Sequence, residues 1–495
     1  MDNDKQKNVL KISHHLENDS VLRVFLLIFI PTFLLMFAMV LNNFIDSILI
    51  SSLTQDNYDP GGNLSYSIGT SLQSYGLSFL GIFTAMVFTV AIGTNILYAN
   101  YIGRGKTKKQ NRDLVQQSIW QNIIFAIVVM SIPVMFANLY SDFVINSSTS
   151  FSNSTYSQDL SSYIMILSLA YVFIAINSNF LRIARSEGHI YISSLISLIP
   201  IFINPLFDYI LMGVFGFGIS GAALATLISN VFLTLFFLTY IHFLIKKDQT
   251  NINFQFKFKF NKMFWVLIAL GMAATFRRLA TSFEQISLLF IIRNLRPIPG
   301  YDQELWSSFF NAVIRVNMLF IVGGLAASQS ATQMIAYFYS NKDKEKLKRT
   351  IFTLIVFIVL VQSVSLLISV GLSPYILKLF GINAILDDPV LRKTLVLTYF
   401  IISLGFLLES ISFVPNAFFN AIKKTKTNSL LIFITKIVSF VILEIIFVVL
   451  YWELPGMSPP LLFSVLIING IFTILFCSVF MINFFNKSVT IKQGF

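Results

Sequence analysis

Long apolar runs recur along this chain between short polar joints, and they constrain the fold more than any other feature. A helix needs about 20 apolar residues to cross the hydrocarbon core of a bilayer. Runs of that kind lie near residues 21–50, 66–100, 114–141, 161–181, 190–215, 219–245, 263–291, 305–338, 350–380, 394–420, 428–452 and 460–484. Hydrophobic residues are 56% of the chain and charged residues 12%, unlike a soluble domain of 495 residues. The runs predict an all-α integral membrane protein with twelve transmembrane helices.

Lysine and arginine concentrate in every second joint of this pattern, as in residues 104–112, 246–259 and 342–349. By the positive-inside rule these joints and both termini are cytoplasmic, in a protein of the plasma membrane. We therefore expect a cytoplasmic N-terminal tail at 1–20 and a C-terminal tail at 486–495. The net charge of +12 follows from the same distribution, so nucleic acid is not an expected partner.

The residues that usually carry catalysis or bind metals are scarce. The chain has one cysteine, Cys477, and four histidines, too few for a disulfide framework or a Cys/His zinc cluster. A P-loop is missing, so ATP is not expected to supply energy directly. We expect no enzyme, no cofactor and no metal beyond Na⁺.

Two landmarks repeat along the chain at the same offset of about 237 residues. At this offset, residues 99–112 align with 336–349, and residues 179–189 with 416–426. Each pair is a helix exit into a basic joint. Six helices per half with the same starting side predict parallel repeats, related by an axis along the membrane normal. We expect an N-lobe at 21–245, a polar cytoplasmic linker at 246–262 and a C-lobe at 263–485.

The fifth run contains three residues that are unusual in a membrane span: Asn204, Pro205 and Asp208. Ionisable groups inside spans normally face a cavity or a partner. Asn204 and Asp208 are four residues apart and share a helix face, and Pro205 frees the backbone carbonyl near Ile201. These oxygens suit a small hard cation or a proton. A hydrogen bond between helices beside a proline kink explains the residues equally well.

Other charges also lie within apolar runs. Asp46 is the only acid of the first run, near its outer end, where water or headgroups would also solvate it. The second half has a larger set in its first, second and fourth runs: Arg277, Arg278, Glu284, Arg315 and Glu409. This set predicts either a second site for a positive charge or structural ion pairs of Glu284 and Glu409 with Arg315 or Arg278.

The stretch NPLFDYILMGVFGFGISGAALAT resembles the multidrug and toxic compound extrusion (MATE) transporters of bacteria, together with IDSILIS, IGRGKTKK, LRIARSEGH and VIRVNMLFIVGGLAASQSATQMIAYFYS. The resemblance covers essentially the whole chain. It implies two pseudo-symmetric six-helix lobes around a central cavity and alternating access. It also implies an antiporter that exports lipophilic organic cations, including drugs, in exchange for Na⁺ or H⁺. The family's cation site falls on Asp46, Tyr163, Asn204, Asp208 and Thr226, with Pro205 as a helix hinge.

The alternative within the same superfamily is a flippase for a lipid-linked saccharide. Such a protein needs a cationic cavity for phosphates, which Arg277, Arg278 and Arg315 would supply. The carboxylates of the first half favour the cation antiporter instead. For either function we expect a monomer whose partners are small molecules and the lipid bilayer.

Overall fold

The structure is a computed structural model, and it describes residues 19–54, 58, 66–103, 106–146, 154–253, 255, 261–293, 304–383, 388–422, 424–454 and 459–490. Within these ranges the regular elements are all helices. Helices satisfy their own backbone hydrogen bonds, which is what a chain in hydrocarbon requires. The expected N-terminal tail at 1–20 lies almost entirely outside the described residues, as do parts of the linker and the end of the C-terminal tail.

Eleven helices of the described chain are long and apolar enough to span a membrane, and a bent pair makes a twelfth. The bent pair is Lys262–Met272 and Thr275–Leu288, with an angle of 54° between its halves. Many outward side chains are large and apolar, such as Met135, Leu139 and Leu367. The prediction of an all-α multi-pass membrane protein is confirmed.

The described helices divide into two compact units that do not coincide with the two halves of the sequence. One unit contains residues 42–312 and 377–383, and the other contains 1–41, 313–376 and 384–495. We call them the 42–312 unit and the 313–495 unit. Two long helices, α2 (Val21–Leu53) and α11 (Glu304–Ser340), contribute residues to both, as does the short helix α13 (Ser373–Leu379). The lobes expected at 21–245 and 263–485 were inferred from a sequence repeat. They stay a prediction.

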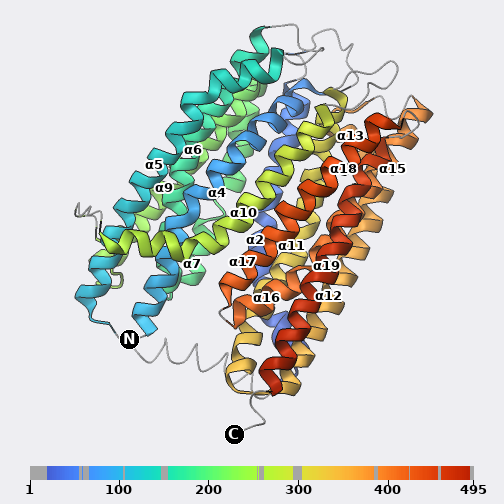
Figure 1. Ribbon diagram of the computed structural model, residues 1–495. Coiled ribbons are helices and arrows are strands. Elements are labelled where there is room, and N and C mark those ends of the chain that lie inside the picture. The colour runs from blue at the N-terminus through green and yellow to red at the C-terminus, as the bar shows by residue number, and fades with distance from the viewer. Residues whose placement is uncertain are drawn as a thin grey trace. The chain divides into compact units, whose positions relative to one another are not determined.

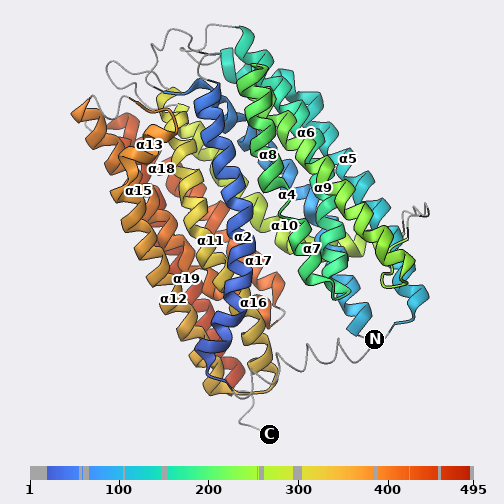
Figure 2. The ribbon, with the colours of Figure 1, turned by 180° about the vertical axis from the view of Figure 1, so that it is seen from behind.

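The 42–312 unit is built from most of the helices of the first half together with α10. Its elements, besides the ends of α2 and α11, are α4 (Ile68–Gly103), α5 (Lys108–Asn146), α6 (Ser154–Ser186), α7 (Ile190–Ile196), α8 (Pro200–Asp208), the π-helical segment η1 (Tyr209–Val214), α9 (Gly218–Lys246) and α10 (Lys262–Arg293). α6 packs against α4, α5 and α9, as Figures 1 and 2 show. Buried side chains of α4, α5, α6 and α9 form its core.

The 313–495 unit holds the remaining helices. They are α12 (Lys344–Gly371), α13 (Ser373–Leu379, which ends in the other unit), α15 (Pro389–Ile411), α16 (Phe413–Ala421), α17 (Thr425–Phe433), the π-helical segment η2 (Ile434–Val438), α18 (Ser439–Glu453) and α19 (Pro459–Thr490). α15 packs against both α12 and α19, drawn in orange and red in Figure 1. The first half of α2 joins this core through Phe25 and Phe29, whose rings meet Phe357 edge to face.

Two glycines allow α4 and α10 to pack with their backbones close together. A Cβ added to Gly93 would lie 1.9 Å from the carbonyl oxygen of Leu267, and one added to Gly271 would lie 2.0 Å from that of Thr89. The hydroxyls of Thr89 and Thr275 hydrogen-bond across the same contact at 2.7 Å. This contact explains why α10, the first helix of the second half, packs in the 42–312 unit.

The start of the linker is held against the 42–312 unit by a buried carboxylate. Glu187 accepts hydrogen bonds from Tyr98, from the Thr250 hydroxyl and from the backbone N–H of Asn251, at 2.6–2.7 Å. Nearby Asp248 pairs with Lys108 and Arg112 of α5, and the hydrogen bond from Lys108 lowers the pKa of Asp248.

Substitution of either close-packed glycine by alanine is expected to destabilise the protein by about 1–3 kcal/mol, because backbone atoms cannot move aside for the new methyl group. Thermal unfolding of G93A and G271A in detergent would measure this. G371A is the matched control, since nothing lies within 4 Å of a Cβ at Gly371. Equal unfolding temperatures for all three variants would contradict the close α4–α10 contact.

Candidate functional site

The fifth span is broken into short pieces where its polar residues lie. α7 ends at Ile196, α8 begins with Pro200 and contains Pro205, and the π-helical segment η1 begins directly after Asp208. Proline lacks the N–H that would continue the helical hydrogen bonds, and π-helical turns leave a local bulge. The sequence therefore places Asn204 and Asp208 on an irregular helix that can present side chains inward.

Asn204 and Asp208 are buried and bonded to each other. Their exposed fractions are 1% and 0%, and the amide nitrogen of Asn204 donates to Oδ2 of Asp208 at 2.6 Å. On the other side, the Ser229 hydroxyl of α9 lies 3.2 Å from Oδ1 of Asn204, its acceptor. This confirms that the two residues share a helix face, and it adds Ser229, which the sequence did not single out.

Asp46 of α2 joins this pair. Its carboxyl group lies close enough to that of Asp208 for the two charges to repel each other. Oδ1 of Asp208 receives no hydrogen bond from an amide or hydroxyl group in the described ranges. Two neighbouring carboxylates repel each other, so a proton on one of them or a bound cation would stabilise the arrangement. Asp46 and Asp208 thus form a carboxyl pair, which we call the Asp46–Asp208 pair.

A line of buried amides and hydroxyls extends from Asp46 to helix α11. Gln73 donates to Oδ2 of Asp46 at 2.9 Å and accepts from the Asn311 amide at 3.1 Å. Asn311 also contacts the carbonyl of Thr70 at 3.1 Å, and the Thr70 hydroxyl meets that of Ser308 at 2.7 Å. Gln73 and Asn311 were missed from the sequence. Their only signal is that each is an uncharged polar residue in an apolar run.

The other two residues expected at the cation site lie on neighbouring helices. Thr226 of α9 is half-buried, and its carbonyl accepts from Asn230 at 2.8 Å and lies 3.0 Å from the Ser229 hydroxyl. The Tyr163 ring of α6 is buried against Gly76 of α4. The direct contacts thus join Asp46, Asn204 and Asp208. The assignment of Thr226 and Tyr163 to the site stays a prediction.

The charges expected in the second half have different surroundings. Glu409 of α15 forms an ion pair with Lys436 of η2, not with an arginine, and the two side chains are 20% and 11% exposed. Glu284 of α10 is buried, at 4% exposure. The guanidinium of Arg278 lies over the Phe88 ring of α4, 4.6 Å from its centre. Lys436 had a sequence signal, because it is the one basic residue inside the run at 428–452.

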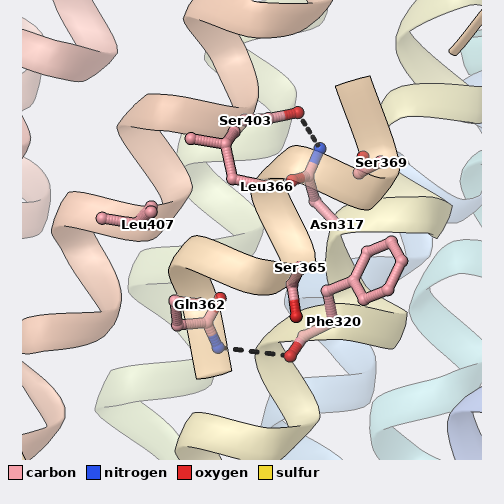
Figure 3. Close-up of a pocket in the computed structure, with 8 residues that line it drawn as sticks. All are labelled: Asn317, Phe320, Gln362, Ser365, Leu366, Ser369, Ser403 and Leu407. Carbon is pink, nitrogen blue, oxygen red and sulfur yellow. Dashed lines mark hydrogen bonds between the residues drawn. The ribbon is translucent and has the colours of Figure 1, made fainter. Parts of the chain in front are cut away.

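A small polar cavity lies within the 313–495 unit, shown in Figure 3. Its volume is about 10 Å³, and its lining comes from α11, α12 and α15. Asn317 donates to Ser403 at 3.1 Å, and Gln362 donates to the carbonyl of Phe320 at 3.2 Å. Its eight lining residues are all uncharged, and a space of this size holds about one water molecule. The cavity therefore suits a structural water.

The Asp46–Asp208 pair, with the Asn204 amide, is the arrangement best suited to chemistry. It offers carboxylate and amide oxygens, the ligand types of hard cations, and it can also take up or release a proton. Groups of three His, Cys, Asp or Glu side chains arranged to hold a metal do not occur in the described part of the chain. The donor set fits Na⁺ or H⁺.

Replacing Gln73 by leucine is expected to destabilise the protein by about 1–3 kcal/mol, because Asp46 loses a donor and Asn311 an acceptor in a buried place. The unfolding temperature of Q73L in detergent would report this loss. Q158L is the control, since the exposed Gln158 side chain makes no hydrogen bond among the described residues. An effect no larger than that of Q158L would show that the buried line of bonds contributes nothing to stability.

Comparison with known proteins supports the interpretation of the fold. The model of the MatE family matches residues 63–210, a range that includes Asn204 and Asp208. An inward-facing structure of a multidrug resistance MATE family transporter of the MOP superfamily has a TM-score of 0.71 and 18% identity, covering 89% of this chain and 94% of that one. The predicted resemblance to MATE transporters is confirmed in sequence over residues 63–210 and in fold over most of the chain.

Two further relatives are informative. A MOP superfamily transporter from Pyrococcus furiosus, whose reversed binding-pocket polarity suggests a different function, has a TM-score of 0.67 and 18% identity, covering 94% of this chain and 97% of that one. An uncharacterized protein of Mycoplasmoides gallisepticum is 25% identical over 403 residues, covering 72% of this chain and 68% of its own length. The first of these agrees in fold and the second in sequence, and both leave the substrate open.

Proposed function

We propose that this chain is a secondary antiporter that exports lipophilic organic cations in exchange for inward Na⁺ or H⁺ by alternating access. The observation that carries the proposal is the Asp46–Asp208 pair, in which Asp208 is fully buried and bonded to Asn204 and Asp46 is half-buried. A charge near the centre of a membrane span costs about 2.5–3.5 kcal/mol on insertion scales, so such a pair is functional by default.

The Asp46–Asp208 pair can bind either of two singly charged cations, a proton or Na⁺. With one proton between the carboxyl groups, the site carries a single negative charge. With Na⁺ bound and both groups ionised, the charge is the same. A proton and a sodium ion are therefore alternative occupants, and each cancels the repulsion that otherwise drives the two carboxylates apart.

Coupling requires that the bound ion favours one conformation of the protein. Asp46 and Asp208 belong to different helices, so neutralising the pair holds α2 against α8, and ionising it separates them. Pro205 and the π-helical turns after Asp208 make that part of the fifth span the natural hinge. The proposed substrate is a cation, so that a positive charge leaves the cell as the coupling cation enters it.

We further propose a monomer in the plasma membrane with both termini in the cytoplasm.

A flippase for a lipid-linked saccharide is the second candidate. It is favoured by Arg278, a solvent-accessible side chain on a membrane-spanning helix that forms no ion pair in the described ranges. The Asp46–Asp208 pair has no evident use for a phosphate-bearing substrate, which keeps the antiporter first.

Efflux of a fluorescent organic cation from proteoliposomes, under Na⁺ and pH gradients imposed separately, tests the proposal. The wild type is expected to respond to one gradient, and D208N is expected to fall to the rate of empty liposomes, because the pair can no longer bind and release a cation. D248N is the control, since it removes a fully exposed carboxylate of the same unit and should export normally. Normal gradient-driven efflux by inserted D208N would refute the site.

A further inference from the structure

Three arginines of the 42–312 unit lie close together. Arg182 and Arg185 are three residues apart on α6 and so share a helix face, and Arg185 is in its last turn. Arg278 comes from α10, one turn after the bend of that helix. The charge of Arg182 interacts with those of both Arg185 and Arg278. We call this set the arginine cluster.

None of the three guanidinium groups has an acidic partner among the described residues. Arg182 donates to the Ser178 hydroxyl at 3.2 Å, Arg185 donates to the Ser194 hydroxyl at 3.1 Å, and Arg278 stacks on Phe88. These neighbours are uncharged. The ionisable group that faces Arg278 from α6, besides Arg182, is the phenol of Tyr171. The cluster therefore gathers three positive charges and leaves them uncompensated.

One donor of the cluster is also buried without an acceptor. Nε of Arg185 is inaccessible to water and makes no hydrogen bond in the described part of the chain. Buried donors in native proteins are almost always paired, so this nitrogen is available to an acceptor such as a water or a ligand oxygen. The Arg278 side chain, by contrast, is exposed.

We infer that the arginine cluster binds a phosphate group. Guanidinium forks match phosphate oxygens in pairs, and one phosphate offers enough oxygens to contact several arginines at once. A carboxylate would bring one negative charge against three positive ones, whereas a phosphate monoester or diphosphate brings two or more. The position of Arg185 at the end of a membrane-spanning helix allows two sources: a lipid headgroup or a phosphate compound in solution.

This site is separate from the Asp46–Asp208 pair and does not depend on the direction or coupling of transport. It uses side chains of α6 and α10, whereas the carboxyl pair uses α2 and α8. The binding test therefore does not involve the Asp46–Asp208 pair, whose role the efflux of D208N tests separately.

The experiment measures the unfolding temperature of the full-length protein in a neutral detergent while one of three probes is titrated: phosphatidic acid, inorganic phosphate or oleate. Oleate is an anionic amphiphile without phosphate. The variants are R182Q, R185Q and R278Q. K109Q is the control, because Lys109 is an exposed cation of the same unit with no partner in the described ranges.

We expect the wild-type unfolding temperature to rise with a phosphate probe and to level off, as for a ligand that binds the folded state. Half-saturation should need at least about tenfold more probe in each arginine variant, because one charge-assisted contact is lost. K109Q should behave as the wild type. Stabilisation by phosphatidic acid alone would identify a lipid headgroup, and stabilisation by inorganic phosphate as well would identify a site open to soluble phosphates.

The inference is overturned if neither phosphate probe stabilises the wild type, if oleate does so equally well, or if the arginine variants respond as the wild type does. Should a glutamine variant fail to fold, R185K and R278K replace it, since lysine keeps the charge but loses the fork. Without a probe, R278Q should unfold no lower than the wild type, because a repelling charge is gone. A lower value would show that Arg278 serves the fold and would count against the site.

Discussion

The cost of placing charge among membrane-spanning helices governs the arrangement of the ionisable residues in this protein. The chain meets that cost in three ways. Asp46 and Asp208 face each other, so that one proton or cation compensates both. Glu409 and Lys436 compensate each other directly. The arginine cluster has no acid to compensate it among the described residues, and this difference separates sites that need a ligand from the ion pair that does not.

Sequence reasoning predicted the parts that depend on local spacing. The apolar runs predicted the spans, and the four-residue interval predicted that Asn204 and Asp208 share a helix face, where the structure has a bond between them. It could not give Gln73 or Asn311, because their contacts depend on the register of helices far apart in the chain. The packing of α10 was missed for a similar reason: the repeat was found from loops, and Gly93 and Gly271 are informative only as a pair.

Helices α2 and α11 contribute residues to both compact units, and both supply the buried line of hydrogen bonds. Asp46 stands on α2 and Asn311 on α11, with Gln73 of α4 between them. Gln73 donates to one carboxyl oxygen of Asp46 and accepts from Asn311, so a single amide links the carboxyl group to α11.

We propose that the Asp46–Asp208 pair holds one proton when no other cation is bound. Infrared difference spectroscopy of the wild type against D208N, near neutral pH and without Na⁺, tests it most directly. The account predicts a band of a protonated carboxyl group in the wild type that shifts in D₂O and is absent from the variant. Carboxylate bands alone in the wild type would show that both groups are ionised and would contradict the account.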